Sequence, residues 1–495
     1  MKRSILTTLL IILLSPALRS QEAKQILQST IQAMGGLDTW KDIEYIKMTH
    51  VGHKHWMEQS ENPNGPFITS YQVVDELRGV WQTQLSRQEG TRQFQSAGEA
   101  KSDIMLNGDK GLMKFGERSF PIPGAYRVNY DEWLRYAPEK LILEGLEATL
   151  QIEKDEVVEG TNHKVLSYTK DGLRHRLFIN PHTKLLYQAE IESFLPQDVF
   201  NYPWGKFKTT IIYSLNWLYP GNIRYPAQWS VYKLGHLFQS ITITSIDFHP
   251  EVPETTFEIP ADLPPTSPAK PVEEAVLNTD GIIEVANNIF TIPGSWYVGH
   301  IIQSDGILVI EGPISSGYNA QHLAYLKEKY PNKPIKAVLA TSDAWPHVGG
   351  IREFAAQKIP VYTHRLNKEI ISRILAADHS PLPDTYEKSK AQPRFELIDK
   401  PVELNDPLNP VRILPVDGEG GERMIMLYFP KSKVLYASDL VQYNGRSQSF
   451  FSPQYLTEVQ AVVERYGLDV ETLFAFHTAP IPYSEMLKSI EKIKP

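Results

Sequence analysis

The chain has 495 residues, of which 42% are hydrophobic and 11% aromatic, so it is long enough for two or three domains with substantial cores. Its formal net charge of −8 gives no general attraction to a polyanion, so nucleic acid is not an expected partner. The chain has no cysteine, which excludes disulfides, thiolate metal ligands, a thiol nucleophile and a lipidated cysteine.

Residues 1–20 have the pattern of a secretory signal peptide. Lys2 and Arg3 precede an apolar run at residues 5–14, and a short segment with Ser, Pro and Ala follows it. The run has about ten residues, roughly half of what crosses a bilayer as a helix. No later segment is apolar enough to span a membrane. We therefore expect an exported protein, periplasmic or secreted, without a transmembrane segment in its mature chain.

Residues 21–261 are predicted to form a mostly antiparallel β domain. A helix is expected at residues 23–34, before Gly35 and Gly36, and strands rich in β-branched and aromatic residues at 209–218, 228–234 and 240–248. In the last strand Ile241 and Ile243 alternate, whereas Ile246 and Phe248 continue one residue out of phase. This break in the alternation predicts a β-bulge.

Residues 262–279 are predicted to be a linker, because four prolines within 262–271 make that segment stiff. Residues 280–495 then alternate between strand and helix patterns. Strands are predicted at 282–292, 301–311, 335–340, 361–363, 411–414, 423–429 and 433–436, and helices at 318–330 and 456–466.

The segment TSDAWPHVGG, residues 341–350, follows the predicted strand IKAVLA and resembles the metal-binding turn THxHxDHxGG of the metallo-β-lactamase superfamily. Four residues match this pattern, namely Thr341, His347, Gly349 and Gly350. Ser342, Ala344 and Pro346 stand where the pattern has His, His and Asp. The resemblance implies an α/β fold for residues 280–495, an αββα sandwich whose relatives are hydrolases with metal ions.

Three further segments resemble the later metal-binding loops of the same family. EGGERMIMLYFP, residues 419–430, has Gly420 in the place of a histidine, whereas KVLYASDLV supplies Asp439 and LFAFHTAP supplies His477. The resemblance implies that all three histidines of the first metal site are replaced. The second site would keep His347, Asp439 and His477 and lack only the aspartate at Pro346. Two histidines and a carboxylate suit one zinc or iron ion, and the alternative is that no metal binds.

Other residues near these loops are candidates for supporting roles. Four acidic residues are considered as substitute ligands, namely Asp343, Asp417, Glu419 and Glu422. Three aromatic residues are considered as pocket walls, namely Trp296, Tyr297 and Trp345. A serine hydrolase using Ser342 and His347 is disfavoured, because no Gly-x-Ser-x-Gly motif surrounds the serine.

Three functions remain open from the sequence. The first is a metallo-β-lactamase-fold protein with an incomplete metal site, reduced or lost hydrolase activity and a binding role, since Pro346 removes a residue that ligates metal and orients the nucleophile in the family. The second is a one-metal hydrolase acting on a small molecule through the surviving ligands. The third is a carrier of a lipid-like ligand, because residues 21–261 and the segment ETTFEIPADLP at their end, residues 254–264, resemble the curved-sheet domains of bacterial lipoprotein carriers. No pattern in the sequence specifies an oligomeric state.

Overall fold

The computed structural model describes residues 19–57, 68–82, 84–94, 98–444, 449–450 and 453–493. The chain folds into two compact units. Unit 1 contains the chain up to His55, Thr69–Ser193 and Phe207–Ala269, and unit 2 contains Phe194–Lys206 and the chain from Lys270 onward, with Trp56 and Met57 grouped with it. Residues 1–18 of the predicted signal peptide lie outside the described part of the chain, and residues 19–33 are helical.

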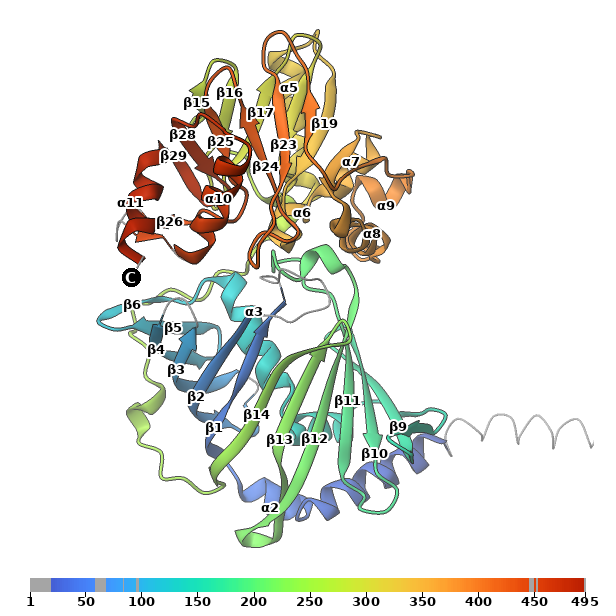
Figure 1. The fold of residues 1–495 in the computed structure, drawn as a ribbon. Helices are drawn as coiled ribbons and strands as arrows, with labels where there is room; N and C mark the ends of the chain where they lie inside the picture. The colour runs from blue at the N-terminus through green and yellow to red at the C-terminus, as the bar shows by residue number, and fades with distance from the viewer. Residues whose placement is uncertain are drawn as a thin grey trace, which may run out of the picture. The chain divides into compact units, whose positions relative to one another are not determined.

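Unit 1 is built on one 14-stranded sheet, visible as the curved sheet in Figure 1. Its strand order is β6-β5-β4-β3-β2-β1-β14-β13-β12-β11-β10-β9-β7, with β8 paired to β9. The strands are β1 (Tyr45–Trp56), β2 (Ile68–Gly79), β3 (Leu85–Phe94), β4 (Gly98–Asn107), β5 (Lys110–Phe115), β6 (Arg118–Pro121), β7 (Gln151–Ile152), β8 (Glu156–Val158), β9 (Thr161–Lys170), β10 (Leu173–Ile179), β11 (Leu186–Ser193), β12 (Phe207–Tyr219), β13 (Ile223–Lys233) and β14 (His236–Asp247). Neighbouring strands of this sheet, such as β1 and β14 or β12 and β13, pair in antiparallel fashion, which confirms the predicted β domain.

The predicted bulge in the last strand of unit 1 is confirmed. Thr49 of β1 lies opposite Ser245, but the next residue, His50, lies opposite Ile243. Thr244 is therefore the extra residue on β14, and it moves Ile246 out of phase with Ile243 as the sequence indicated.

Helices pack against the sheet of unit 1 and fill its interior with side chains. These are the helix of residues 19–33, α2 (Leu37–Asp42), α3 (Gly124–Arg135) and α4 (Pro138–Glu147). The core includes Trp40 of α2, Trp133 of α3 and Trp229 of β13, and the last two rings lie 5.4 Å apart. This packed aromatic interior argues against a hollow sheet that holds an apolar ligand.

A buried ion-pair network also lies inside unit 1. Arg78 of β2 is fully buried and donates to Glu76 at 2.9 Å, to Glu139 of α4 at 3.0 Å and to the hydroxyl of Tyr225 at 2.5 Å. Such a network joins the sheet to α4, and each charged group has its opposite within hydrogen-bond distance.

Unit 2 contains two sheets packed face to face, and Figure 1 labels several of their strands. The first has seven strands in the order β15 to β21, and the second has six in the order β22-β23-β24-β25-β28-β29. The strands are β15 (Ile283–Ala286), β16 (Ile289–Ile292), β17 (Val298–Ile302), β18 (Ile307–Ile310), β19 (Ile335–Ala340), β20 (Val361–His364), β21 (Phe395–Ile398), β22 (Val402–Leu404), β23 (Val411–Pro415), β24 (Ile425–Phe429), β25 (Val434–Tyr436), β28 (Thr472–Ala475) and β29 (Thr478–Pro482), and a separate pair is β26 (Tyr443–Asn444) and β27 (Ser449–Phe450).

Helices cover the outer faces of the two sheets of unit 2. Apolar residues from both sheets, such as Ile301 and Leu427, form the layer between them. On one outside face, His322 of α5 contacts His300 of β17, and on the other α10 and α11 pack against the second sheet. The helices are α5 (Ser316–Lys329), α6 (Trp345–Val348), α7 (Ile351–Ala356), α8 (Lys368–Ala376), α9 (Thr385–Ser389), α10 (Pro453–Arg465) and α11 (Tyr483–Ile493). This arrangement confirms the predicted αββα sandwich.

Two strand predictions in unit 2 were wrong. Residues 282–292 form β15 and β16, and residues 301–311 contribute to β17 and β18, so each apolar run is a hairpin and not one strand. The first run turns at Asn287 and Asn288, the second of which has a positive φ of 63°, and the second run turns at Asp305 and Gly306. These short polar interruptions reverse the chain, because asparagine, aspartate and glycine tolerate turn conformations.

Within the described ranges, no helix has the length and apolar character needed to cross a membrane. The segment Phe194–Lys206, which connects β11 to β12, belongs to unit 2 and contains the short 3₁₀ helix Tyr202–Trp204. Unit 2 therefore includes a segment that lies more than sixty residues before the main part of the unit in the sequence.

Candidate metal site

The strands of unit 2 bring four loops with acidic or histidine side chains to one edge of the sandwich. β18 and β19 are parallel neighbours in the first sheet, and β25 and β28 are parallel neighbours in the second. Glu311, His347, Asp439 and His477 each follow the carboxyl end of one of these strands. Because parallel strands end at the same edge of a sheet, the four loops converge there.

His347, Asp439 and His477 form a group whose potential ligand atoms all lie within 4.8 Å of one another. Asp439 Oδ1 lies 3.6 Å from His347 Nε2 and 3.0 Å from His477 Nε2. The His347 side chain is buried, whereas those of Asp439 and His477 are 18% and 30% exposed. The site is therefore closed behind His347 and open to solvent on the side of His477.

Glu311 stands directly behind His347 and is a site residue that the sequence reasoning missed. Its Oε1 lies 3.2 Å from His347 Nδ1 and accepts hydrogen bonds from the hydroxyls of Thr341 and Tyr436, the latter at 2.9 Å. Glu311 is fully buried and has a positive φ of 69°. The sequence signal for Glu311 was an acidic residue directly after the apolar strand ILVI. A carboxylate at the end of a buried strand needs hydrogen-bond or charged partners.

The electrostatic field at this group favours positive charge. Burial by itself would lower the pKa of His347, but the carboxylates of Glu311 and Asp439 outweigh it and raise that pKa to about 9. Burial would raise the pKa of Asp439, but His477 and His347 hold it well below its usual range. Within the described part of the chain, neither ring nitrogen of His347 makes a well-aligned hydrogen bond, although both lie near carboxylates. Its Nε2 is thus available to a ligand.

Aromatic rings pack against His347 and lie beside the loop of His477. The Phe476 ring stacks on the imidazole of His347 with centroids 3.6 Å apart, and Trp296 stacks on Phe476 at 5.7 Å and 8°. The backbone N–H of Tyr297 donates to the carbonyl of Phe476 at 2.8 Å. Of the predicted pocket residues, Trp296 and Tyr297 are half-buried beside the His477 loop, whereas Trp345 is buried.

The segment Phe194–Lys206 adds a second set of aromatic contacts that the sequence reasoning did not identify. Phe200 packs edge-on against Trp296 with centroids 6.3 Å apart, and Trp204 packs edge-on against Trp345 at 4.6 Å. The aromatic run FNYPW, residues 200–204, was the visible signal. Its role depends on tertiary contacts that no local pattern reveals.

The positions of the missing histidines are filled by packed protein. Ser342 is fully buried and accepts a hydrogen bond from the backbone N–H of Ala344 at 3.1 Å, so its hydroxyl is engaged within its own loop. A Cβ placed on Gly420 would lie 2.4 Å from the ring of Tyr455. The backbone N–H of Gly420 donates to Glu458 of α10 at 2.9 Å. The loop around Gly420 is thus anchored to α10 in a conformation without room for a histidine.

The four candidate substitute ligands lie outside the group formed by His347, Asp439 and His477. Asp343 is buried with both carboxylate oxygens lacking hydrogen-bond partners among the described residues, and burial raises its pKa to about 7 against the opposing charge of Arg423, 3.9 Å away. Asp417 pairs with Arg465 of α10. The remaining two, Glu419 and Glu422, are exposed.

Comparisons with known proteins find likeness over part of the chain only. No family model matches the chain. The chain is 27% identical over 158 residues to the 2,4-dinitroanisole O-demethylase subunit alpha of Nocardioides sp. (strain JS1661), a match that covers 32% of this chain and 45% of that relative. The chain therefore spans less than half the length of this curated relative.

Two solved structures are similar to part of the chain. A metallo-beta-lactamase from Pontibacter korlensis is 12% identical with a TM-score of 0.34, covering 42% of this chain and 96% of that one. The stereoselective inverting sec-alkylsulfatase Pisa1 from Pseudomonas sp. is 17% identical with a TM-score of 0.33, covering 43% of this chain and 41% of that one. The two-sheet sandwich of unit 2 has the αββα arrangement that the sequence resemblance implied.

Proposed function

We propose that unit 2 is a one-metal hydrolase whose ion is held by His347, Asp439 and His477. The observation that carries this proposal is the convergence of three ligand atoms within 4.8 Å of one another at the open edge of the sandwich. Glu311 is the positioning residue, because its carboxylate faces Nδ1 of His347 and leaves Nε2 directed at the group. Carboxylate–histidine–metal arrangements of this kind fix the tautomer of the ligand.

The donor atoms of these residues suit a divalent ion, and the two separations from Asp439 Oδ1 are those that one ion requires. Tetrahedral zinc with bonds of about 2.0–2.1 Å separates neighbouring ligand atoms by about 3.3 Å. The separations of 3.0 and 3.6 Å around Asp439 Oδ1 bracket that value. Two histidines and a carboxylate leave a coordination position open, as catalytic sites require. The alternative occupant with the same donor set is ferrous iron.

A bound divalent ion would supply Lewis-acid chemistry at this site. The protein's own contribution is to hold the ion and to orient its ligands. His347 is fixed between Glu311 and Phe476, and His477 stands on the solvent side where a substrate would enter. Pro346 offers no carboxylate to orient a nucleophile, so we expect slow turnover.

The substrate class that we propose is a small aromatic ester or ether. Trp296 and Phe200 are half-buried rings beside the loop of His477, and an aromatic substrate would stack on such rings. The name of the curated relative refers to O-demethylation of 2,4-dinitroanisole, an aromatic ether, which supports a test with that compound.

A second candidate function is metal-dependent binding without turnover. It is favoured by Pro346, which replaces the acidic residue of the family motif, and by the filled first site at Gly420. This candidate predicts the same metal stoichiometry as the first but no hydrolysis, so one set of measurements separates them.

The test is elemental analysis of the purified full chain, followed by turnover assays with 2,4-dinitroanisole and p-nitrophenyl esters. We expect close to one zinc or iron per chain and release of the coloured phenol. His477→Ala should lose both metal and turnover, whereas the exposed His249→Ala should retain them. If the protein binds neither ion after incubation with zinc or with iron, the proposal is overturned. One bound metal ion per chain without turnover would establish the binding candidate.

Export is part of the proposal and is supported by the basic start and apolar run of residues 1–20. Cell fractionation with N-terminal sequencing tests it. We expect the protein outside the cytoplasm with a shortened N-terminus, and an intact cytoplasmic chain would refute export without affecting the metal site.

A further inference from the structure

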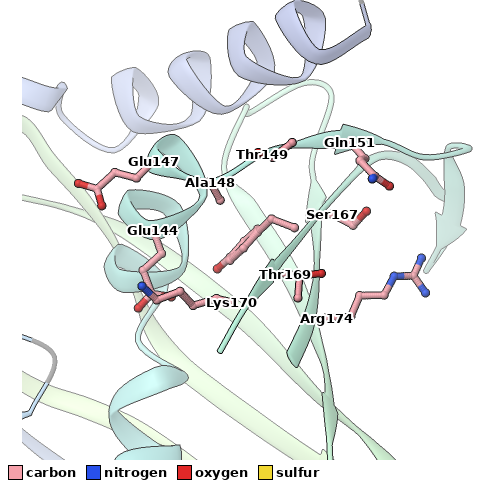
Figure 2. Close-up of a pocket in the computed structure, with 10 residues that line it drawn as sticks. Glu144, Glu147, Ala148, Thr149, Gln151, Ser167, Thr169, Lys170 and Arg174 are labelled. Carbon is pink, nitrogen blue, oxygen red and sulfur yellow. The ribbon is translucent and has the colours of Figure 1, made fainter. Parts of the chain in front are cut away.

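Unit 1 has a polar pocket beside the end of α4, and the charged side chains at its two sides already have charged neighbours. Figure 2 shows Glu144 on one side of this pocket and Arg174 on the other. Arg174 pairs with Glu153 at 2.6 Å and with Glu192 at 3.6 Å. Burial raises the pKa of Glu144, and the nearby charge of Lys170 opposes this rise. Among the described residues, the pocket therefore presents no set of unpartnered opposite charges to a ligand.

The hairpin of β12 and β13 in unit 1 ends in an exposed apolar segment, residues 215–219, here called the hairpin tip. Leu215, Trp217 and Leu218 are 48%, 55% and 56% exposed, although large apolar side chains are most often buried. Figure 1 shows this hairpin in green, with its turn beside α2 at one end of the sheet. Three such side chains within four residues form a contiguous apolar surface, which in a folded protein marks a site of interaction.

The apolar side chains of the hairpin tip lie on both faces of the hairpin. Trp217 is opposite Tyr225 of β13, whose side chain is buried in the core, whereas Leu218 is opposite the exposed Arg224. Opposed residues of an antiparallel pair point to the same face, and successive residues of a strand point to opposite faces. Trp217 and Leu218 therefore lie on different faces, and a flat partner surface would cover only one of them.

The hairpin tip also has a free backbone edge. β12 pairs with β13 as far as Tyr219, but its registered pairs with β11 end at Ile212. In the described part of the sheet, β12 has no other neighbouring strand, and no loop contributes a backbone hydrogen bond to residues 215–219. The N–H and C=O groups that point to this side can therefore pair with an added strand, as they can on any sheet edge.

Leu215 marks the place where β12 leaves β11. Its φ of 53° lies in the left-handed region, which is costly for leucine because the Cβ comes too close to the following carbonyl oxygen. Backbone strain of this kind is concentrated at functional segments, where the surrounding structure maintains it. A left-handed residue also bends a strand, so Leu215 directs the rest of the hairpin tip away from β11 and leaves its edge open.

We propose that the hairpin tip pairs with the hairpin tip of a second copy of this chain, the two β12 edges running antiparallel about a two-fold axis at Trp217. The free segment, residues 215–219, is centred on that residue. Residues 209–219 carry no charged side chain, so two copies meet without repulsion between like charges. Pairing edge to edge brings side chains together on both faces, which suits Trp217 on one face and Leu218 on the other.

A lipid surface is the other occupant that could surround an apolar hairpin tip, and two features disfavour it. Residues 209–219 carry no lysine or arginine that would attract an anionic membrane. The free N–H and C=O groups of β12 would lose their water in the hydrocarbon region without gaining partners there. A second β12 edge satisfies these groups and covers the apolar side chains in the same step.

The contact is small, so the association should be weak. Three large side chains and a short backbone edge from each copy bury less than the roughly 1,200 Å² at which stable interfaces begin. We therefore expect a dissociation constant on the order of 100 µM.

Sedimentation velocity of the full chain tests the pairing over about 5–300 µM, a range that brackets the expected constant. We expect a shift from monomer to dimer as the concentration rises. Trp217→Glu should abolish this shift, because two like charges would then face each other across the axis. Trp81→Ser is the matched control, since it removes a tryptophan that is 43% exposed in the turn between β2 and β3, and it should leave the shift unchanged.

A charge-pair experiment distinguishes self-pairing from any other contact. Trp217→Glu and Trp217→Lys should each be monomeric and keep the Tm of the unmodified protein, whereas an equimolar mixture of the two should form a dimer, because the opposed positions then carry opposite charges. The proposal fails if the unmodified chain is monomeric throughout the range, if Trp217→Glu still forms the dimer, or if the mixture stays monomeric. Flotation of a monomeric chain with phosphatidylglycerol vesicles, lost in Trp217→Glu, would assign the hairpin tip to a membrane and would also refute self-pairing.

Discussion

The ring of Tyr455 on α10 occupies the space that a side chain at position 420 would need, 2.4 Å from the position of a Cβ on Gly420. The packing between α10 and the loop of Gly420 therefore leaves no space for a histidine at this position. Packing against Tyr455 thus opposes a histidine at position 420, where the resembled motif has one.

We expect Gly420→His to destabilise unit 2 by about 1–3 kcal/mol, because the added side chain must displace the Tyr455 ring in a packed region. Urea unfolding of the full chain measures this loss. In a Tyr455→Ala background, Gly420→His should lower the free energy of unfolding by less than it does in the unmodified protein. Equal stability of Gly420→His and the unmodified protein would show that the space is not fixed.

Glu311→Gln is expected to weaken zinc binding roughly 10- to 100-fold, the usual effect of losing a carboxylate behind a histidine ligand. The glutamine keeps the size of the side chain but removes the charge that faces His347 Nδ1 at 3.2 Å. Competition with a chromophoric chelator measures the affinity. Glu311→Asp, which keeps the charge, should retain more affinity than Glu311→Gln.

The matched control for this variant is Glu396→Gln on β21, a partly exposed residue of the same unit that pairs with Arg394. It should leave zinc affinity unchanged. Unaltered affinity in Glu311→Gln, with correct folding, would remove Glu311 from its positioning role.

The buried pair of His300 and His322 should make unit 2 sensitive to acid. Burial lowers the pKa of His322 from 6.5 to about 4. Burial, with the charges of His322 and Lys329, also holds the pKa of His300 well below its usual value. Because the unfolded chain takes up these protons below pH 6.5 and the folded chain does not, stability is lost as pH falls from 6.5 to about 4. The pKa shift of His322, from 6.5 to about 4, corresponds to about 3 kcal/mol of the free energy of unfolding.

His322→Leu should reduce this dependence, since leucine takes up no proton in either state. Thermal unfolding at pH 7 and pH 4.5 gives the comparison, and His249→Leu on the surface should keep the slope of the unmodified protein. An unchanged slope in His322→Leu would show that another group controls acid stability.

Arg78→Met should destabilise unit 1 by about 3–5 kcal/mol. The substitution leaves Glu76 and Glu139 buried without their shared cation, and an uncompensated buried charge is costly. Denaturant unfolding measures the effect. Arg365→Met, which breaks the exposed pair with Asp399, should have a much smaller effect, because solvent screens exposed ion pairs. Similar small effects for both would mean that the buried network relaxes or admits water.

Local patterns predicted those parts of the fold that depend on neighbouring residues. The strand at residues 335–340 was found with its correct ends, and the bulge at Thr244 followed from a change of phase between Ile243 and Ile246. The strands at 282–292 and 301–311 were misjudged, because a two-residue turn such as Asn287 and Asn288 is a weak signal inside a long apolar run.

The sequence by itself determined which residues of the resembled motif are present, since the identities of His347, Asp439 and His477 are read directly from the chain. Tertiary structure decided what surrounds them. Glu311 and Tyr436 meet across 125 residues, and Phe200 reaches Trp296 from a segment that interrupts unit 1. Contacts between such distant segments depend on how whole sheets and loops pack, and no periodicity within one segment records them.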